Sequence, residues 1–145
     1  MQNYHDPHAE IIEVGFAPVE VTNIISQIGS DEIDIAVQGT QLFPIFEYPS
    51  SASFSEKKAA SGDYVDQEMD VVFTNSAADF VASQRQWIDK DCLVLLRYTN
   101  GEVRVAGTSE APVRCEIEES GKPRTLKVAF KRKSPEFTKV LKSLI

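Results

Sequence analysis

Apolar and polar residues alternate along the segment from Asp63 to Thr74. A period of two is the signature of a β-strand that has one face buried and one face in solvent. The apolar positions predict the buried face: Val65, Met69, Val71 and Phe73. The positions between them predict an exposed face that is mostly acidic: Tyr64, Asp66, Glu68 and Asp70. This strand is the best-defined element of the sequence.

Most of the chain consists of further short β-rich runs separated by glycine and proline. In the first third these runs are 11–14, 19–22, 33–37 and 42–48. Pro44 lies inside the last run, which predicts an edge strand or a bulge there. With 42% hydrophobic and 26% charged residues the composition is that of a globular protein. We therefore expect a mainly β fold, an antiparallel β-sandwich or barrel, in a single domain over 1–145 with a flexible tail at 1–9.

Two helices are predicted in addition. Residues 76–89 begin with a capping-box pattern, Ser76 to Asp79, and form a central amphipathic helix. Its apolar face holds Ala77, Phe80, Val81, Gln84, Trp87 and Ile88. Trp87 on this face is expected to anchor the core rather than to bind a ligand. Residues 135–144 predict a short C-terminal helix with Ser134 as N-cap and Pro135 in its first turn, docked on its own domain or on a neighbour.

Two β-hairpins are predicted after the central helix. Asn100-Gly101 favours a two-residue type I′ turn, which places Arg97 opposite Arg104. These arginines are either solvated beside local acids or form a contact for an acidic partner surface. The second hairpin turns at 120–123 and pairs Glu119 with Arg124 and Glu116 with Lys127. Its inner face holds Val113, Cys115, Ile117, Leu126, Val128 and Phe130.

The segment 49–62 contains one large apolar residue, Phe54, within a run of serine, alanine and the two lysines Lys57 and Lys58. Such a stretch is either a mobile loop or a projecting hairpin arm, and loops of this length are often functional. The segment is therefore a candidate for contact with another subunit.

Charge is divided unequally along the chain. Residues 121–145 carry eight lysines and arginines against one acid, a net of +7, whereas residues 1–120 carry 7 against 21, a net of −14. Opposite signs on one subunit favour head-to-tail self-association or binding of a polyanion. The basic residues Lys131, Arg132 and Lys133 are expected to face the acidic residues of another copy: Asp63, Asp66, Glu68 and Asp70.

Signatures of catalysis and cofactor binding are absent from the sequence. It has no GxSxG, GxGxxG or GxxxxGK[ST] motif, and its two histidines, His5 and His8, flank Pro7 near the start. Cys92 and Cys115 are expected to be buried reduced thiols rather than a disulfide or a metal site. We expect no enzyme activity, cofactor, metal or membrane contact. No stable nucleic-acid binding is expected either, because the basic run lacks interleaved aromatic residues.

Residues 62–130 resemble tail-associated structural proteins of bacteriophages and prophages, especially those of Bacteroidetes hosts. The resemblance is carried by the acidic strand 62–73, the helix after it, the strand 93–101, the phrase VAGTSEAP at 105–112 and the closing hairpin. It implies a tail-tube-like β-sandwich subunit with one flanking helix, in rings that stack into a tube. The segment 49–62 is then the arm that reaches a neighbour, and the acidic excess suits a lumen through which DNA passes.

The resemblance implies a non-enzymatic, ring-forming subunit whose partners are its own copies and other tail proteins. Such a protein resides in the bacterial cytoplasm during synthesis and in the virion or a tail-like particle after assembly. The alternative is an oligonucleotide-binding β-barrel that uses the basic C-terminal region together with Arg97 and Arg104.

Overall fold

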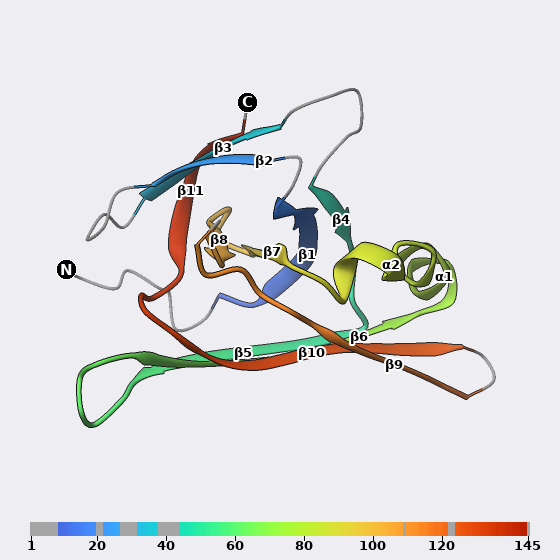
Figure 1. The fold of residues 1–145 in the computed structure, drawn as a ribbon. Coiled ribbons are helices and arrows are strands. Elements are labelled where there is room, and N and C mark those ends of the chain that lie inside the picture. Colours follow the sequence, from blue (N-terminus) through green and yellow to red (C-terminus); the bar gives the residue numbers. More distant parts are fainter. Residues whose placement is uncertain are drawn as a thin grey trace.

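The computed structural model describes residues 9–19, 22–26, 32–37, 44–108, 110–121 and 124–144 of the 145-residue chain. This part of the chain forms two β-sheets and two short helices (Figure 1). The predicted mainly β fold is confirmed, and within the described ranges neither sheet closes into a barrel. The predicted tail at 1–9 lies outside the described residues except for Ala9.

The larger sheet has seven strands. In spatial order they are β2 (Thr22–Ser26), β3 (Glu32–Val37), β11 (Lys139–Leu144), β8 (Val103–Ala106), β7 (Cys92–Tyr98), β1 (Ile11–Pro18) and β4 (Ile45–Glu47). All neighbours are antiparallel except β3 and β11, which are parallel. The sheet curls, so that β2 and β3 lie above β7 and β8 (Figure 1). Pro44 precedes β4, which is an edge strand as predicted. Of the strand predicted at 19–22, residues 20 and 21 lie outside the described residues, and Thr22 is the first residue of β2.

The smaller sheet lies beneath the larger one and has four antiparallel strands (Figure 1). Their order is β5 (Ser51–Lys58), β6 (Val65–Thr74), β10 (Thr125–Ser134) and β9 (Glu116–Ser120). The predicted alternation in β6 is confirmed, because Val65, Met69, Val71 and Phe73 are all buried. Residues 51–58 of the expected loop or arm are a strand paired with β6 along its whole length. The turn between β5 and β6 extends past the rest of the molecule, at the left in Figure 1.

Hydrophobic side chains are buried on both faces of the larger sheet. One cluster fills the space between the two sheets, where the rings of Phe16 and Phe73 lie 6.3 Å apart. A second cluster fills the concave side of the curled sheet, where Ile33 and Ile35 of β3 belong to the same group as Leu95 of β7. Burial on both faces explains why β7, CLVLLRY, is almost continuously apolar.

The predicted helix 76–89 is instead two helices, α1 (Asn75–Ser83) and α2 (Arg85–Ile88), separated at Gln84. The capping box does not form: Thr74 is the N-cap and makes no side-chain cap bond. Asp79 pairs instead with Arg124 of the β9–β10 turn, at 3.1 Å. Phe80 is 40% exposed rather than on the buried face, which is formed by Ala78, Val81 and Ile88. Trp87 packs against the core as predicted.

The predicted C-terminal helix at 135–144 is wrong, because this segment contains strand β11. Ser134 does bind the next turn, since its hydroxyl donates to the Glu136 carbonyl at 2.6 Å and accepts from the Glu136 N–H at 3.3 Å. The chain then leaves the smaller sheet and enters the larger one. There Val140 lies between Arg104 of β8 and Glu32 of β3. The backbone N–H and C=O groups of β11 therefore find hydrogen-bond partners on two neighbouring strands.

Both predicted hairpin registers are wrong. The β7–β8 loop has three residues, because Tyr98 N–H bonds to Glu102 O at 2.8 Å and Gly101 N–H bonds to Tyr98 O at 3.0 Å. Gly101 has a φ of 87°, which fits a loop with a glycine bulge rather than a two-residue turn. The β9–β10 pairing is displaced by two residues and sets Glu118 opposite Lys127. A displacement of two keeps each side chain on its predicted face.

Among the described residues, no helix has both the length and the apolar character needed to cross a membrane.

Candidate functional site

The outer face of the smaller sheet carries ladders of opposite charge within one chain. Lys133 lies directly opposite Asp66 and Lys131 opposite Glu68, while Lys57 of β5 flanks Asp66 from the other side. The Lys127 ammonium also lies 3.3 Å from the carboxylate of Asp70. Lys131 and Lys133, expected to face the acidic strand of another copy, therefore already face that strand in their own chain. Asp63 precedes β6 and lies in the turn that follows β5.

Arg132 points to the other side of the sheet, as its place between Lys131 and Lys133 in the strand requires. Phe54 is also directed inward, and its ring lies 6.3 Å from that of Phe130. Lys57 and Lys58 are exposed at the end of β5. The candidate residues of the sequence thus divide between an outer charged surface and the interior.

Arg97 and Arg104 are not opposite each other and do not form one basic surface. Arg97 pairs with Glu13 at 2.6 Å and lies 4.4 Å from the centre of the Phe46 ring. Arg104 is only 3% exposed and pairs with Glu102 at 2.7 Å. The changed register sets them on opposite faces of the larger sheet. The oligonucleotide-binding alternative therefore loses the two arginines that it added to the basic C-terminal region, and we do not propose it.

The two outer strands of the smaller sheet differ in charge. Strand β9, EIEES, carries three glutamates, whereas β5, SASFSEKK, ends in Lys57 and Lys58. Within the described part of the chain, each of these strands pairs on one side only. A groove of about 530 Å³ lies beside β5. It is lined by residues 9–11, 49–54 and Tyr98, and its apolar lining includes Ile11, Ala52 and Phe54.

A polar cluster lies between the sheets at the end away from the helices. The Glu56 carboxylate accepts hydrogen bonds from Thr138 N at 2.9 Å, Thr138 Oγ1 at 2.6 Å and Gln67 Nε2 at 3.1 Å. This cluster was not predicted from the sequence. Gln67 is in phase with Val65 and Met69, so the alternation placed its side chain inward, but nothing in the sequence indicated its partners.

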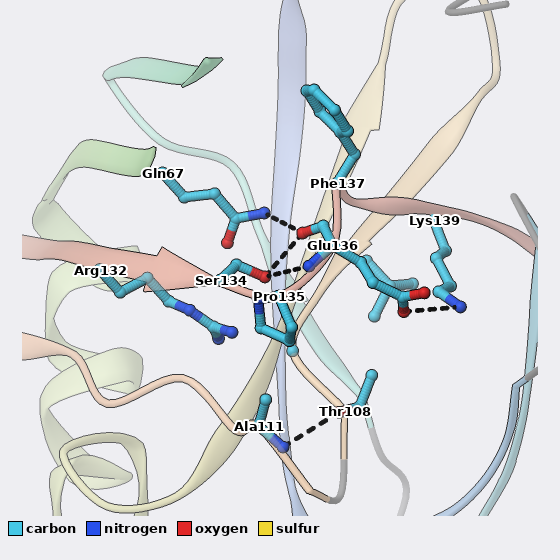
Figure 2. Close-up of a pocket in the computed structure, with 11 residues that line it drawn as sticks. Gln67, Thr108, Ala111, Arg132, Ser134, Pro135, Glu136, Phe137 and Lys139 are labelled. Atoms are coloured by element: carbon cyan, nitrogen blue, oxygen red, sulfur yellow. Dashed lines mark hydrogen bonds and ion pairs between the residues drawn. The ribbon is translucent and has the colours of Figure 1, made fainter. Parts of the chain in front are cut away.

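A small pocket adjoins this cluster, formed by β6, β10, the β10–β11 connection and the residues Gly107, Thr108 and Ala111 (Figure 2). Its volume is about 20 Å³, and Gln67, Thr108, Arg132 and Ser134 contribute polar groups to its lining. At its border Lys139 pairs with Glu136 at 3.0 Å. Burial lowers the pKa of the Arg132 guanidinium, because the charged form is poorly solvated there.

The two cysteines are buried free thiols, as predicted. They are neighbours: a hydrogen bond to Cys92, together with burial, raises the pKa of the Cys115 thiol well above its usual range. Such thiols are poor nucleophiles because the thiolate is disfavoured. In the described ranges no three His, Cys, Asp or Glu side chains are grouped to hold a metal ion, and His5 and His8 lie outside those ranges.

A scan against protein-family models, a search of curated proteins and a search of solved structures each returned no match to this chain.

Proposed function

We propose that this protein is a non-enzymatic structural subunit that joins copies of itself edge to edge, as a ring-forming component of a phage-like tail. The observation that carries the proposal is the smaller sheet, whose two outer strands bear opposite charge. The assignment to a tail rests on the resemblance of residues 62–130 given above. That resemblance also makes other tail proteins its further partners and the virion its final location.

Edge strands present unpaired N–H and C=O groups that pair readily with another chain. Because the four strands alternate in direction, β5 and β9 run antiparallel, and β9 of one copy can continue the sheet beside β5 of the next. Glutamates of β9 then approach the lysine-bearing edge of the neighbour. This contact uses two different surfaces, and such heterologous contacts generate closed rings or open filaments.

The groove beside β5 supports the same contact. Ile117, the inward residue of β9, is only half-buried in its own chain. Beside the β5 of a neighbour it would cover Ala52 and Phe54, which line the groove. The outer face of the joined sheet would remain charged and hydrophilic, which suits the wall of a channel through which DNA passes.

Charge reversal at the two edges tests this proposal. We expect Glu116→Lys with Glu118→Lys to reduce self-association, most strongly at low salt, and Lys57→Glu with Lys58→Glu to do the same. Equimolar mixing of the two doubly substituted proteins should restore association between them. Sedimentation measures assembly, electron microscopy detects rings, and urea unfolding verifies that each variant is folded.

Lys142→Glu is the matched control, because Lys142 is an exposed lysine of β11, a strand of the larger sheet that contributes to neither edge. The wild-type protein remaining monomeric over a wide range of concentration and salt, without rings, would refute the proposal. An equal loss of association in the Lys142 variant would show that the two edge strands are not the contact surfaces.

A further inference from the structure

We propose that one resident water molecule occupies the pocket of Figure 2 and bridges the guanidinium of Arg132 to the side-chain oxygen of Gln67. Both groups line the pocket, and Arg132 and Gln67 are directly opposite each other in the β6–β10 ladder. Side chains in that relation on one face of a sheet lie next to each other. This site is independent of the assembly edges described above.

The pocket holds one donor and one acceptor that lack a partner. Gln67 Oε1 and Arg132 Nη1 are buried atoms with no hydrogen bond to any described residue. Gln67 is 1% exposed, so bulk water does not reach it. Buried polar atoms of this kind are nearly always satisfied, by protein or by ordered water.

The amide orientation of Gln67 is fixed by its other contacts. Its Nε2 donates to the Glu56 carboxylate at 3.1 Å and to the Glu136 carbonyl at 3.5 Å. Both of these partners only accept, so a flipped amide would set oxygen against oxygen. The atom directed at the pocket is therefore the acceptor, whereas a guanidinium only donates.

A ligand for this pocket must accept from Arg132 and donate to Gln67. An anion satisfies the first requirement and places its lone pairs against Gln67 Oε1. A cation can contact Gln67 Oε1 but cannot accept a hydrogen bond from the Arg132 guanidinium. Water meets both requirements, and a pocket of about 20 Å³ exceeds the roughly 10–15 Å³ that one water needs. The Thr108 hydroxyl, which accepts from Ala111 N–H at 3.0 Å, lines the pocket and offers a third contact.

A high-resolution crystal structure of the full chain tests the proposal directly. We expect one ordered water within hydrogen-bond distance of both Arg132 Nη1 and Gln67 Oε1. Crystals soaked in bromide should show no anomalous peak in the pocket. Absence of a water that contacts both atoms, or a bromide ion in its place, would overturn the assignment.

A solution measurement complements the crystal. Magnetic relaxation dispersion counts water molecules whose residence time exceeds the rotational correlation time of the protein. We expect Arg132→Met to lose one such water relative to wild type. Lys131→Met is the matched control, because the adjacent side chain points outward, and it should keep the wild-type count. An unchanged count in folded Arg132→Met would also overturn the proposal.

Discussion

The Glu56 carboxylate accepts two hydrogen bonds from Thr138, one from its backbone N–H at 2.9 Å and one from its hydroxyl at 2.6 Å. Glu56 belongs to an outer strand of the smaller sheet, and Thr138 immediately precedes β11 of the larger sheet. These bonds therefore join the two sheets at the end away from the helices.

Glu56→Ala should destabilise the fold by about 2–3 kcal/mol, because it leaves the Thr138 donors and one Gln67 donor without their charged acceptor. Thr138→Val, which removes only the hydroxyl, should cost about half as much. Urea unfolding measures both. Ser55→Ala, at the exposed neighbouring position, is the control and should stay within about 0.5 kcal/mol of wild type. A similarly small effect for Glu56→Ala would show that the bonds do not stabilise the sandwich.

Lys133→Glu should lower stability rather than only reduce self-association, because it sets a carboxylate directly opposite Asp66. A like-charge cross-strand pair costs roughly 0.5–1 kcal/mol, and the cost should shrink in high salt. Adding Asp66→Lys should recover part of the loss. Lys142→Glu, at an exposed position of β11, is the control. Weaker association of Lys133→Glu at unchanged unfolding free energy would instead assign Lys133 to a contact between subunits.

Tyr98 should make stability depend on pH above 10. Its burial raises its pKa to about 12, Arg104 opposes this shift, and Glu56 and Glu102 add to it. Because the phenolate is disfavoured in the fold, the stabilisation is complete below the unfolded pKa of about 10 and is lost as pH rises toward 12. A shift of about two units corresponds to about 3 kcal/mol. Tyr98→Phe should remove this component of the pH dependence in urea unfolding, whereas Tyr48→Phe, at a 68% exposed position, should not.

Gly15→Ala should destabilise the β1–β4 pair. A Cβ at this position would lie 2.6 Å from Cε1 of Phe46, which is directly opposite Gly15. The ring, which also contacts the Arg97 guanidinium, would have to shift, and such overpacking costs about 1–3 kcal/mol. Adding Phe46→Ala should remove the clash, so the double variant should lose less than the sum of the two single losses. Additive losses of stability in thermal unfolding would show that the contact with the Phe46 ring is not the cause of the destabilisation by Gly15→Ala.

The sequence predicted the β6 alternation correctly because that strand has one apolar and one solvated face. No such alternation exists in β7, whose residues Cys92 to Leu96 are all buried. With both faces buried, a register slip by one residue does not move an apolar side chain into water. The Asn100-Gly101 pair correctly predicted the position of the turn but did not distinguish a two-residue loop from the observed three-residue loop. The extra loop residue shifts the register by one, so Arg104 lies opposite Leu96 and is buried.

The C-terminal segment shows a second limit. Its apolar residues fit helical spacing, and local sequence favoured the helix. The strand is selected by the edges of β3 and β8, which come from distant parts of the chain. The polar cluster is similar, because Gln67 and Glu136 are 69 positions apart. Local patterns therefore predicted elements with local causes, and missed those that depend on a partner elsewhere.

The parallel pairing of β3 with β11 has a consequence for biosynthesis. Residues 32–37 leave the ribosome about 100 residues before 139–144 do, which at roughly 5–20 residues per second means a wait of several seconds. Throughout that interval β3 has only β2 as a neighbour, and β8, which is made about 36 residues before β11, has only β7 until β11 emerges. The nascent chain therefore exposes two unpaired strand edges, one on β3 and one on β8, until β11 emerges and inserts between them. A chaperone that binds extended apolar segments would have its longest opportunity at β3.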